Sequence, residues 1–175
     1  MKKFKSKKVL ILGIGNILHK DDGLGVFIVN EIINSVKDLP KNIEVADGGV
    51  LGYDLLSLMS GRERIVIVDA LKADDKPGSV YKFPAKYLID SNNKFSLHEM
   101  GVKKIIDMLS LTGENPEIEI IGVVPEDINS LEIGISDSVK KSIPKAVEYI
   151  LDAAVKKPVV NIIPLKNGSR GRASL

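Results

Sequence analysis

The chain of 175 residues contains no cysteine, which excludes disulfides, thiolate metal sites and cysteine nucleophiles. Histidine is scarce as well, because only His19 and His98 occur. A metal site in this chain therefore has to take most of its ligands from carboxylates.

Long hydrophobic runs are also lacking. No segment approaches the roughly 20 apolar residues that cross a bilayer. Lysines followed by an apolar stretch make residues 2–18 look like a secretion signal, but a small-residue cleavage site is missing. We interpret this stretch as the first strand and expect a cytoplasmic protein with no membrane partner.

Acidic residues are absent from both ends of the chain. Residues 1–8 hold five lysines and residues 156–175 hold five lysines or arginines, whereas the interval between them has a net charge of −8. A body of that charge offers no basic groove, so we expect no nucleic-acid partner. By length, residues 1–155 form one domain, and residues 156–175 are a basic tail.

Apolar, β-branched runs alternate with amphipathic stretches along the chain. We predict strands at 8–14, 43–46, 64–69, 79–83 and 118–124, and helices at 23–37, 52–60, 97–110 and 136–154. Pro144 should kink or restart the last helix. This alternation predicts an α/β fold, a mostly parallel sheet between two helical layers.

Two of the predicted strands lead into acids that we expect to be exposed, Asp22 and Asp69. In open α/β sheets, ligands bind at the carboxyl edge, where such acids would lie. Together with the imidazole of His98, the two carboxylates would suit a divalent metal ion.

Each of these residues also has a plainer interpretation. Asp21 or Asp22 could cap the following helix, which would leave the other acid to face a ligand. Asp69 could stabilise a turn. Ser96 and Glu99 form a capping-box pattern, which places His98 in the first helical turn, where the dipole favours the neutral ring.

Two further features favour ordinary structural roles. His19 is expected to face solvent rather than to bind a metal. The Asp47-Gly48-Gly49 turn could lie against an extended peptide, although bonding of Asp47 to its own backbone is the more economical explanation.

Familiar catalytic motifs are incomplete in this sequence. Gly13-Ile14-Gly15 lacks the third glycine of a dinucleotide loop, because position 18 is Leu18. His-Glu-x-x-His fails at Val102, and no Gly-x-Ser-x-Gly elbow is present.

An ordered set of motifs nevertheless resembles a known family. These are Gly-Ile-Gly-Asn-Ile-Leu-x-x-Asp-Asp-Gly-Leu-Gly-Val (13–26), Asp-Gly-Gly (47–49), Ile-Val-Ile-Val-Asp-Ala (65–70), Ser-Leu-His-Glu-Met-Gly (96–101) and Gly-Val-Val-Pro-Glu (122–126). Over residues 8–154 the chain is similar to the nickel–iron hydrogenase maturation endopeptidases.

The resemblance implies a five-stranded twisted sheet and an endopeptidase that removes the C-terminal extension of a hydrogenase large-subunit precursor after nickel insertion. It places the catalytic, nickel-contacting residues at Asp22, Asp69 and His98. No cofactor would be bound permanently, because the precursor brings the nickel. The resemblance leaves the oligomeric state open.

Several alternatives stay open at this point. The metal could polarise the scissile carbonyl, activate water or only position the peptide, and an aspartate could act as general base. The chain could also be a related metal- or aspartate-dependent peptidase with another protein substrate, or a non-catalytic nickel or nucleotide binder.

Overall fold

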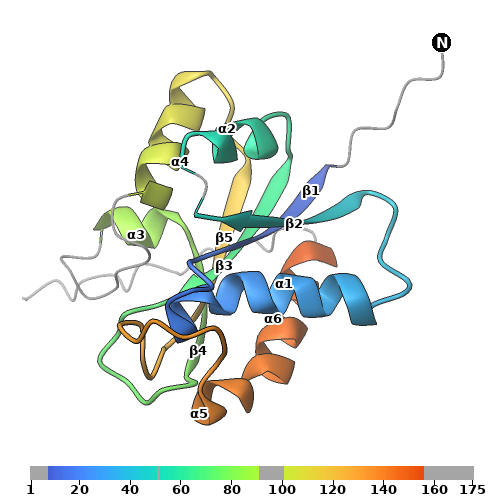
Figure 1. Cartoon of the computed structure of the whole chain (residues 1–175). Helices are drawn as coiled ribbons and strands as arrows, with labels where there is room; N and C mark the ends of the chain where they lie inside the picture. The colour runs from blue at the N-terminus through green and yellow to red at the C-terminus, as the bar shows by residue number, and fades with distance from the viewer. Residues whose placement is uncertain (1–7, 51, 91–100, 156–175) are drawn as a thin grey trace, which may run out of the picture.

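Five strands form a single sheet in the computed structural model, which describes residues 8–50, 52–90 and 101–155 (Figure 1). The strands are β1 (Val9–Ile14), β2 (Ile43–Gly49), β3 (Arg64–Ala70), β4 (Val80–Pro84) and β5 (Glu117–Val123). Their order in the sheet is β2-β1-β3-β5-β4. Strands β2, β1, β3 and β5 are parallel to one another, and β4 runs antiparallel to β5. This confirms the predicted mostly parallel, five-stranded sheet.

Helices cover both faces of the sheet (Figure 1). They are α1 (Leu24–Ser35), α2 (Asp54–Met59), α3 (Lys86–Asp90), α4 (Gly101–Leu111), α5 (Asp137–Lys140) and α6 (Ile143–Val155), with a 3₁₀ turn, η1 (Lys20–Gly23), before α1. One core cluster joins α1 and α6 to the sheet, and the other joins α2 and α4 to its opposite face. The structure is therefore the three-layer α/β/α sandwich expected from the sequence.

The central strands are mostly apolar because helices cover both faces of the sheet. In β3, Val66 and Val68 belong to the α1–α6 side, whereas Ile65 and Ile67 belong to the α2–α4 side. In the described part of the chain, no helix combines the length and the apolar character needed to cross a bilayer.

The predicted elements match the observed ones closely, with three differences. The last predicted helix is divided into α5 and α6, and Pro144 lies in the first turn of α6, which confirms the restart. The short helix α3 was not predicted, and residues 97–100 of the predicted helix 97–110 lie outside the described residues.

The third difference is that Asp47-Gly48-Gly49 belongs to β2 rather than to a loop after it. Gly13 pairs with Asp47 but Ile14 pairs with Gly49, so Gly48 is an extra residue in a bulge. The N–H of Gly49 donates to Oδ1 of Asp47 at 2.8 Å, which confirms the backbone-bonding interpretation of this acid.

Glycine lets the start of α1 approach the sheet directly. A Cβ atom at Gly25 would lie 2.2 Å from the carbonyl oxygen of Val68 and 2.4 Å from that of Ile14. The amino end of α1 is therefore fixed against the carboxyl ends of β1 and β3, where the predicted acids lie.

Gly25→Ala should lower the free energy of unfolding by about 2 kcal/mol or more, because the added methyl group meets two backbone oxygens that cannot move independently. Chemical denaturation measures the change. Gly52→Ala is the matched control, since a Cβ there meets nothing within 4 Å. Equal stability of the two variants would contradict this account of the α1 contact.

Candidate functional site at the carboxyl edge of the sheet

Asp69 is the penultimate residue of β3, at the carboxyl edge. It pairs in register with Gly122 of β5, and its side chain is fully buried. The N–H of Ala70 donates to Oδ1 of Asp69 at 2.8 Å. The expectation that this acid is exposed is therefore wrong. Strand β5 pairs alongside it and η1 packs against β3, and neither neighbour can be read from its local sequence.

Asp22 lies in η1, and it too is buried, with 8% of its surface exposed. The N–H of Asn16 donates to its Oδ2 at 3.2 Å. The chain doubles back closely here, since a Cβ atom at Gly15 would lie 1.9 Å from the carbonyl oxygen of Asp22. The predicted exposure of Asp22 is wrong for this reason: the residues that follow β1 fold over their own glycine turn.

The two acids come from neighbouring elements, because η1 packs against β3. The N-cap of α1 is Gly23, and no side chain caps the helix, so the suggestion that Asp21 or Asp22 caps it is wrong. The uncapped amino end instead points its partial positive charge toward this edge of the sheet.

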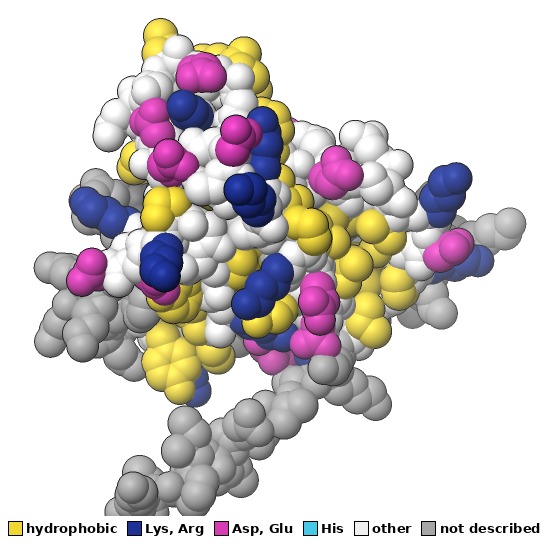
Figure 2. Space-filling view, turned by 90° about the horizontal axis from the view of Figure 1, so that it is seen from below, with side chains coloured by type: hydrophobic (Ala, Val, Ile, Leu, Met, Phe, Trp, Pro, Cys, Tyr) yellow, Lys and Arg dark blue, Asp and Glu magenta, His cyan; other side chains and the backbone are white. Residues whose placement is uncertain are grey.

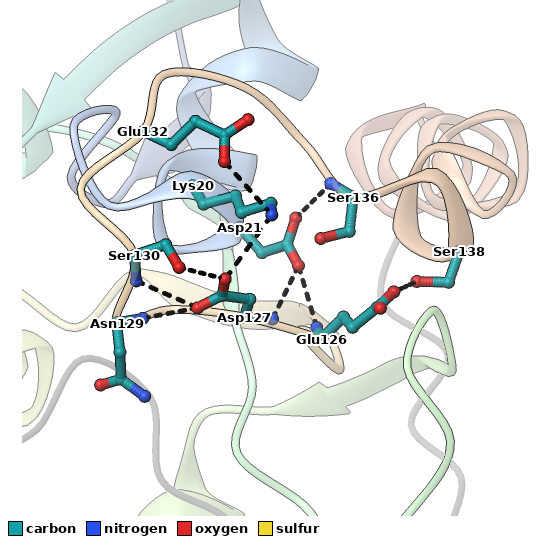
Figure 3. Close-up of polar contacts among 9 residues, drawn as sticks. All are labelled: Lys20, Asp21, Glu126, Asp127, Asn129, Ser130, Glu132, Ser136 and Ser138. Atoms are coloured by element: carbon teal, nitrogen blue, oxygen red, sulfur yellow. Dashed lines mark hydrogen bonds and ion pairs between the residues drawn. The ribbon is translucent and has the colours of Figure 1, made fainter.

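Asp21 has a different role, which the sequence did not reveal. Its carboxylate is fully buried. Oδ2 accepts the N–H groups of Glu126 at 2.9 Å and Asp127 at 3.0 Å, and Oδ1 accepts that of Ser136 at 2.6 Å (Figure 3). One side chain thus holds both ends of the segment 126–136 against η1.

Lys20 strengthens the same connection. It is the only non-glycine residue with positive φ (48°) among those described, and its N–H donates to the carbonyl of Glu132 at 2.8 Å. Its Nζ lies 3.3 Å from a carboxylate oxygen of Glu132 and 3.5 Å from one of Asp127 (Figure 3). The hydrogen bond with the Glu132 carboxylate and its negative charge raise the pKa of Lys20, and the Asp127 carboxylate adds a smaller effect in the same direction. We call these contacts of Lys20 and Asp21 with residues 126–136 the η1 clasp.

Asp127 organises the segment from within. The Ser130 hydroxyl donates to Oδ2 at 2.5 Å, and the N–H groups of Asn129 and Ser130 both donate to Oδ1 at 3.0 Å (Figure 3). The Ser130 hydroxyl above all, then the two N–H groups, hold the pKa of Asp127 well below its ordinary value. The turn at residues 127–130 is therefore stabilised by its own hydrogen bonds.

The remaining predicted residues are placed only in part. His98, with Ser96 and Glu99, lies outside the described residues. His19 is half-buried, and its backbone forms an isolated parallel bridge with Glu132. Within residues 8–50, 52–90 and 101–155, no three histidine or acidic side chains are grouped closely enough to hold a metal ion. The described part of the site consists of the two buried acids.

Comparison with known proteins identifies the family. The model of the hydrogenase maturation protease family matches residues 27–153. The chain is 35% identical over 164 residues to the hydrogenase 2 maturation protease of Escherichia coli, an alignment that covers 90% of this chain and 96% of that one. The chain belongs to the hydrogenase maturation proteases.

Solved structures agree with this assignment. The hydrogenase maturating endopeptidase HybD of E. coli superposes with a TM-score of 0.75 at 34% identity, over 83% of this chain and 91% of that one. The [NiFe] hydrogenase maturation protease HybD of Thermococcus kodakarensis gives 0.72 at 32% identity, over 84% and 99%. Peptide hydrolysis is accordingly the chemistry of this maturation protease, and the non-catalytic alternative is set aside.

Asp21→Ala should lower the free energy of unfolding by about 3 kcal/mol, because three backbone N–H groups lose a buried acceptor. Thermal or chemical denaturation measures the loss. Asp74→Ala removes an exposed carboxylate and serves as the control, with a change near zero. A fully stable Asp21→Ala variant would show that the η1 clasp does not hold the fold together.

Acidification should loosen the turn at Asp127. A folded-state pKa below the ordinary 3.8 means that its contribution to stability is complete above that value and is lost as the pH falls below it. The amide NMR signals of Asn129 and Ser130 should therefore stay constant from neutral pH downward and shift only below 3.8. Asp127→Asn should abolish that titration, and a midpoint at or above 3.8 would contradict the assignment.

Proposed function

We propose that this protease removes the C-terminal extension of a nickel–iron hydrogenase large-subunit precursor after nickel has been inserted. We further propose that Asp22, Asp69 and His98 contact the nickel that the precursor carries. Membership of the family supports the kind of substrate. The placement of two acids of the motif set at one edge of the sheet is the observation that supports the contact residues.

The chemistry of these residues suits nickel. Two carboxylates and one neutral imidazole form an incomplete set of hard and borderline ligands, which a metal already held by another protein can complete. Asp22 comes from η1 and Asp69 from β3, which pack together. His98 follows in the Ser-Leu-His-Glu motif, directly before α4.

The burial of Asp22 and Asp69 gives a physical reason for metal-dependent docking. An ionised carboxylate removed from water requires donors or a cation close by. Backbone N–H groups of Asn16 and Ala70 are among the donors to these two acids. A divalent ion delivered by the substrate would attract both negative charges at once, so productive docking would depend on the metal. A precursor without nickel would lack that anchor, which would make cleavage a check on metal insertion.

Two roles for the acids remain compatible with this proposal. The metal can polarise the scissile carbonyl, or one aspartate can act as general base toward the attacking water. In both schemes the protein contributes fixed negative charge at the carboxyl edge and a rigid neighbouring turn.

Processing of a purified precursor tests the proposal directly. We expect the nickel-loaded precursor to lose its C-terminal extension and the nickel-free precursor to stay intact, as read by mass spectrometry of the trimmed end. Equal cleavage of both forms would contradict metal recognition, and cleavage of neither would contradict the substrate assignment.

Substitution of the three residues tests their roles. Asp22→Asn, Asp69→Asn and His98→Ala should each slow processing by about a hundredfold or more while leaving the fold intact, since the charge or ring that meets the metal is lost. Asp47→Asn is the matched control, because Asp47 is an exposed acid at the carboxyl end of β2. Normal processing by the three variants would overturn the assignment.

A further inference from the structure

Exposed apolar side chains gather at the same edge of the sheet as the proposed site. Of the eleven large hydrophobic residues exposed in the described part of the chain, seven lie on the segments that follow β1, β2 and β5. Ile128, at 36%, is the least exposed of the seven, and the other six are exposed further. We call these six the apolar rim: Ile17, Leu18, Val50, Tyr53, Leu131 and Ile133.

Backbone contacts bring the three segments together. The N–H of Gly15 donates to the carbonyl of Gly49 at 2.9 Å, which places the start of the first segment beside Val50. His19 and Glu132 form a parallel bridge, so Leu18 and Leu131, each one residue earlier, run alongside each other. The segments after β1 and β5 therefore lie side by side, with Val50 of the segment after β2 next to them.

Asp22 lies within this region. Its carboxylate accepts the N–H of Asn16, the residue directly before Ile17. A Cβ atom at Gly23 would lie 2.5 Å from Cα of Ile17, so the rim segment rests on η1 itself. A molecule that covers the rim would therefore also cover the acid proposed to meet nickel.

The rim is held in place before any partner arrives. Leu131 and Ile133 flank Glu132, whose carbonyl and carboxylate both contact Lys20, and the whole segment is fastened by Asp21 (Figure 3). Ordering the segment in advance lowers the entropic cost of binding. It also argues against a chance exposure of apolar side chains on a loose loop.

The form of the rim indicates what it fits. Leu131 is 80% exposed and Ile133 is 66% exposed, so these side chains project outward instead of lining a groove. Projecting side chains fill hollows on a folded surface, whereas an extended peptide needs a groove or a free strand edge. The face seen from below in Figure 1, where segment 124–136 and α5 lie, shows hydrophobic side chains interspersed with charged ones (Figure 2).

We propose that the apolar rim is the surface on which the folded body of the large-subunit precursor docks, separately from contacts at the scissile bond. The inference rests on the function proposed above and adds to it a second, metal-independent recognition element. Exposed apolar clusters of this kind mark protein–protein contact sites.

The double variant Leu131→Ser/Ile133→Ser tests the proposal with nickel-loaded precursor. We expect KM to rise by about tenfold or more, because two projecting apolar side chains are lost from the contact. We expect kcat to stay near the wild-type value, since neither side chain belongs to the proposed catalytic set. An unchanged Tm establishes that the variant is folded.

Leu111→Ser/Val155→Ser is the matched control. These residues are 87% and 63% exposed, and they end α4 and α6 at the opposite edge of the sheet, where Arg64 at the start of β3 bonds the carbonyl of Ala153. This variant should keep the wild-type KM. Unchanged KM in the rim variant, or an equal rise in the control, would overturn the docking surface.

Two further outcomes separate the causes of failure. If the wild-type protease cleaves the precursor and the rim variant does so with the same KM, only the docking surface is wrong. If the wild-type protease cleaves no precursor, the proposed function fails, and the docking surface with it. Sedimentation that shows a wild-type dimer and a monomeric rim variant would assign the rim to a second copy of this chain and would also overturn the proposal.

Discussion

The buried carboxylate of Asp21 is the interaction on which the functional edge of this protein depends. It accepts three backbone N–H groups from the segment 126–136, which is more than one hundred positions away in the sequence. A charge without access to water is stable only when donors of this kind surround it. The hydrogen bonds of Asp21 therefore fix η1 and the segment 126–136 relative to each other. They position Asp22, which lies in η1, and the rim residues of the segment.

Two adjacent acids therefore differ in what they do. Asp21 binds the segment 126–136, whereas Asp22 is the acid proposed to meet nickel. The turn η1, which carries both acids, packs against β3, the strand whose penultimate residue is Asp69. The glycines on either side permit the close contacts: Gly15 lets the chain return over itself, and Gly25 lets α1 approach the backbone of Val68.

Much of the fold could be predicted because the hydrophobic pattern is strong. Strand β1 and residues 65–68 of β3 are continuous apolar runs, as expected of strands covered on both faces, and the amphipathic stretches between the strands form helices. The motif set also identified the family. Exposure of the acids could not be predicted, since Asp69 looks like an accessible strand end until β5 and η1 are placed beside β3. The structural role of Asp21 could not be predicted either, because its hydrogen-bond partners lie in the segment 126–136, far away in the sequence.

The sequence by itself determined the α/β class, the strand positions, the restart of the last helix at Pro144, and the family to which the protease belongs. These properties depend on local hydrophobic periodicity and on the order of the motifs, both of which can be recognised in the sequence alone. Only the tertiary structure decided that both Asp22 and Asp69 are buried, that Asp21 binds the segment 126–136, and that six scattered apolar side chains form one rim. Each of these depends on long-range contacts, which form only when the parallel strands bring their carboxyl ends to a common edge.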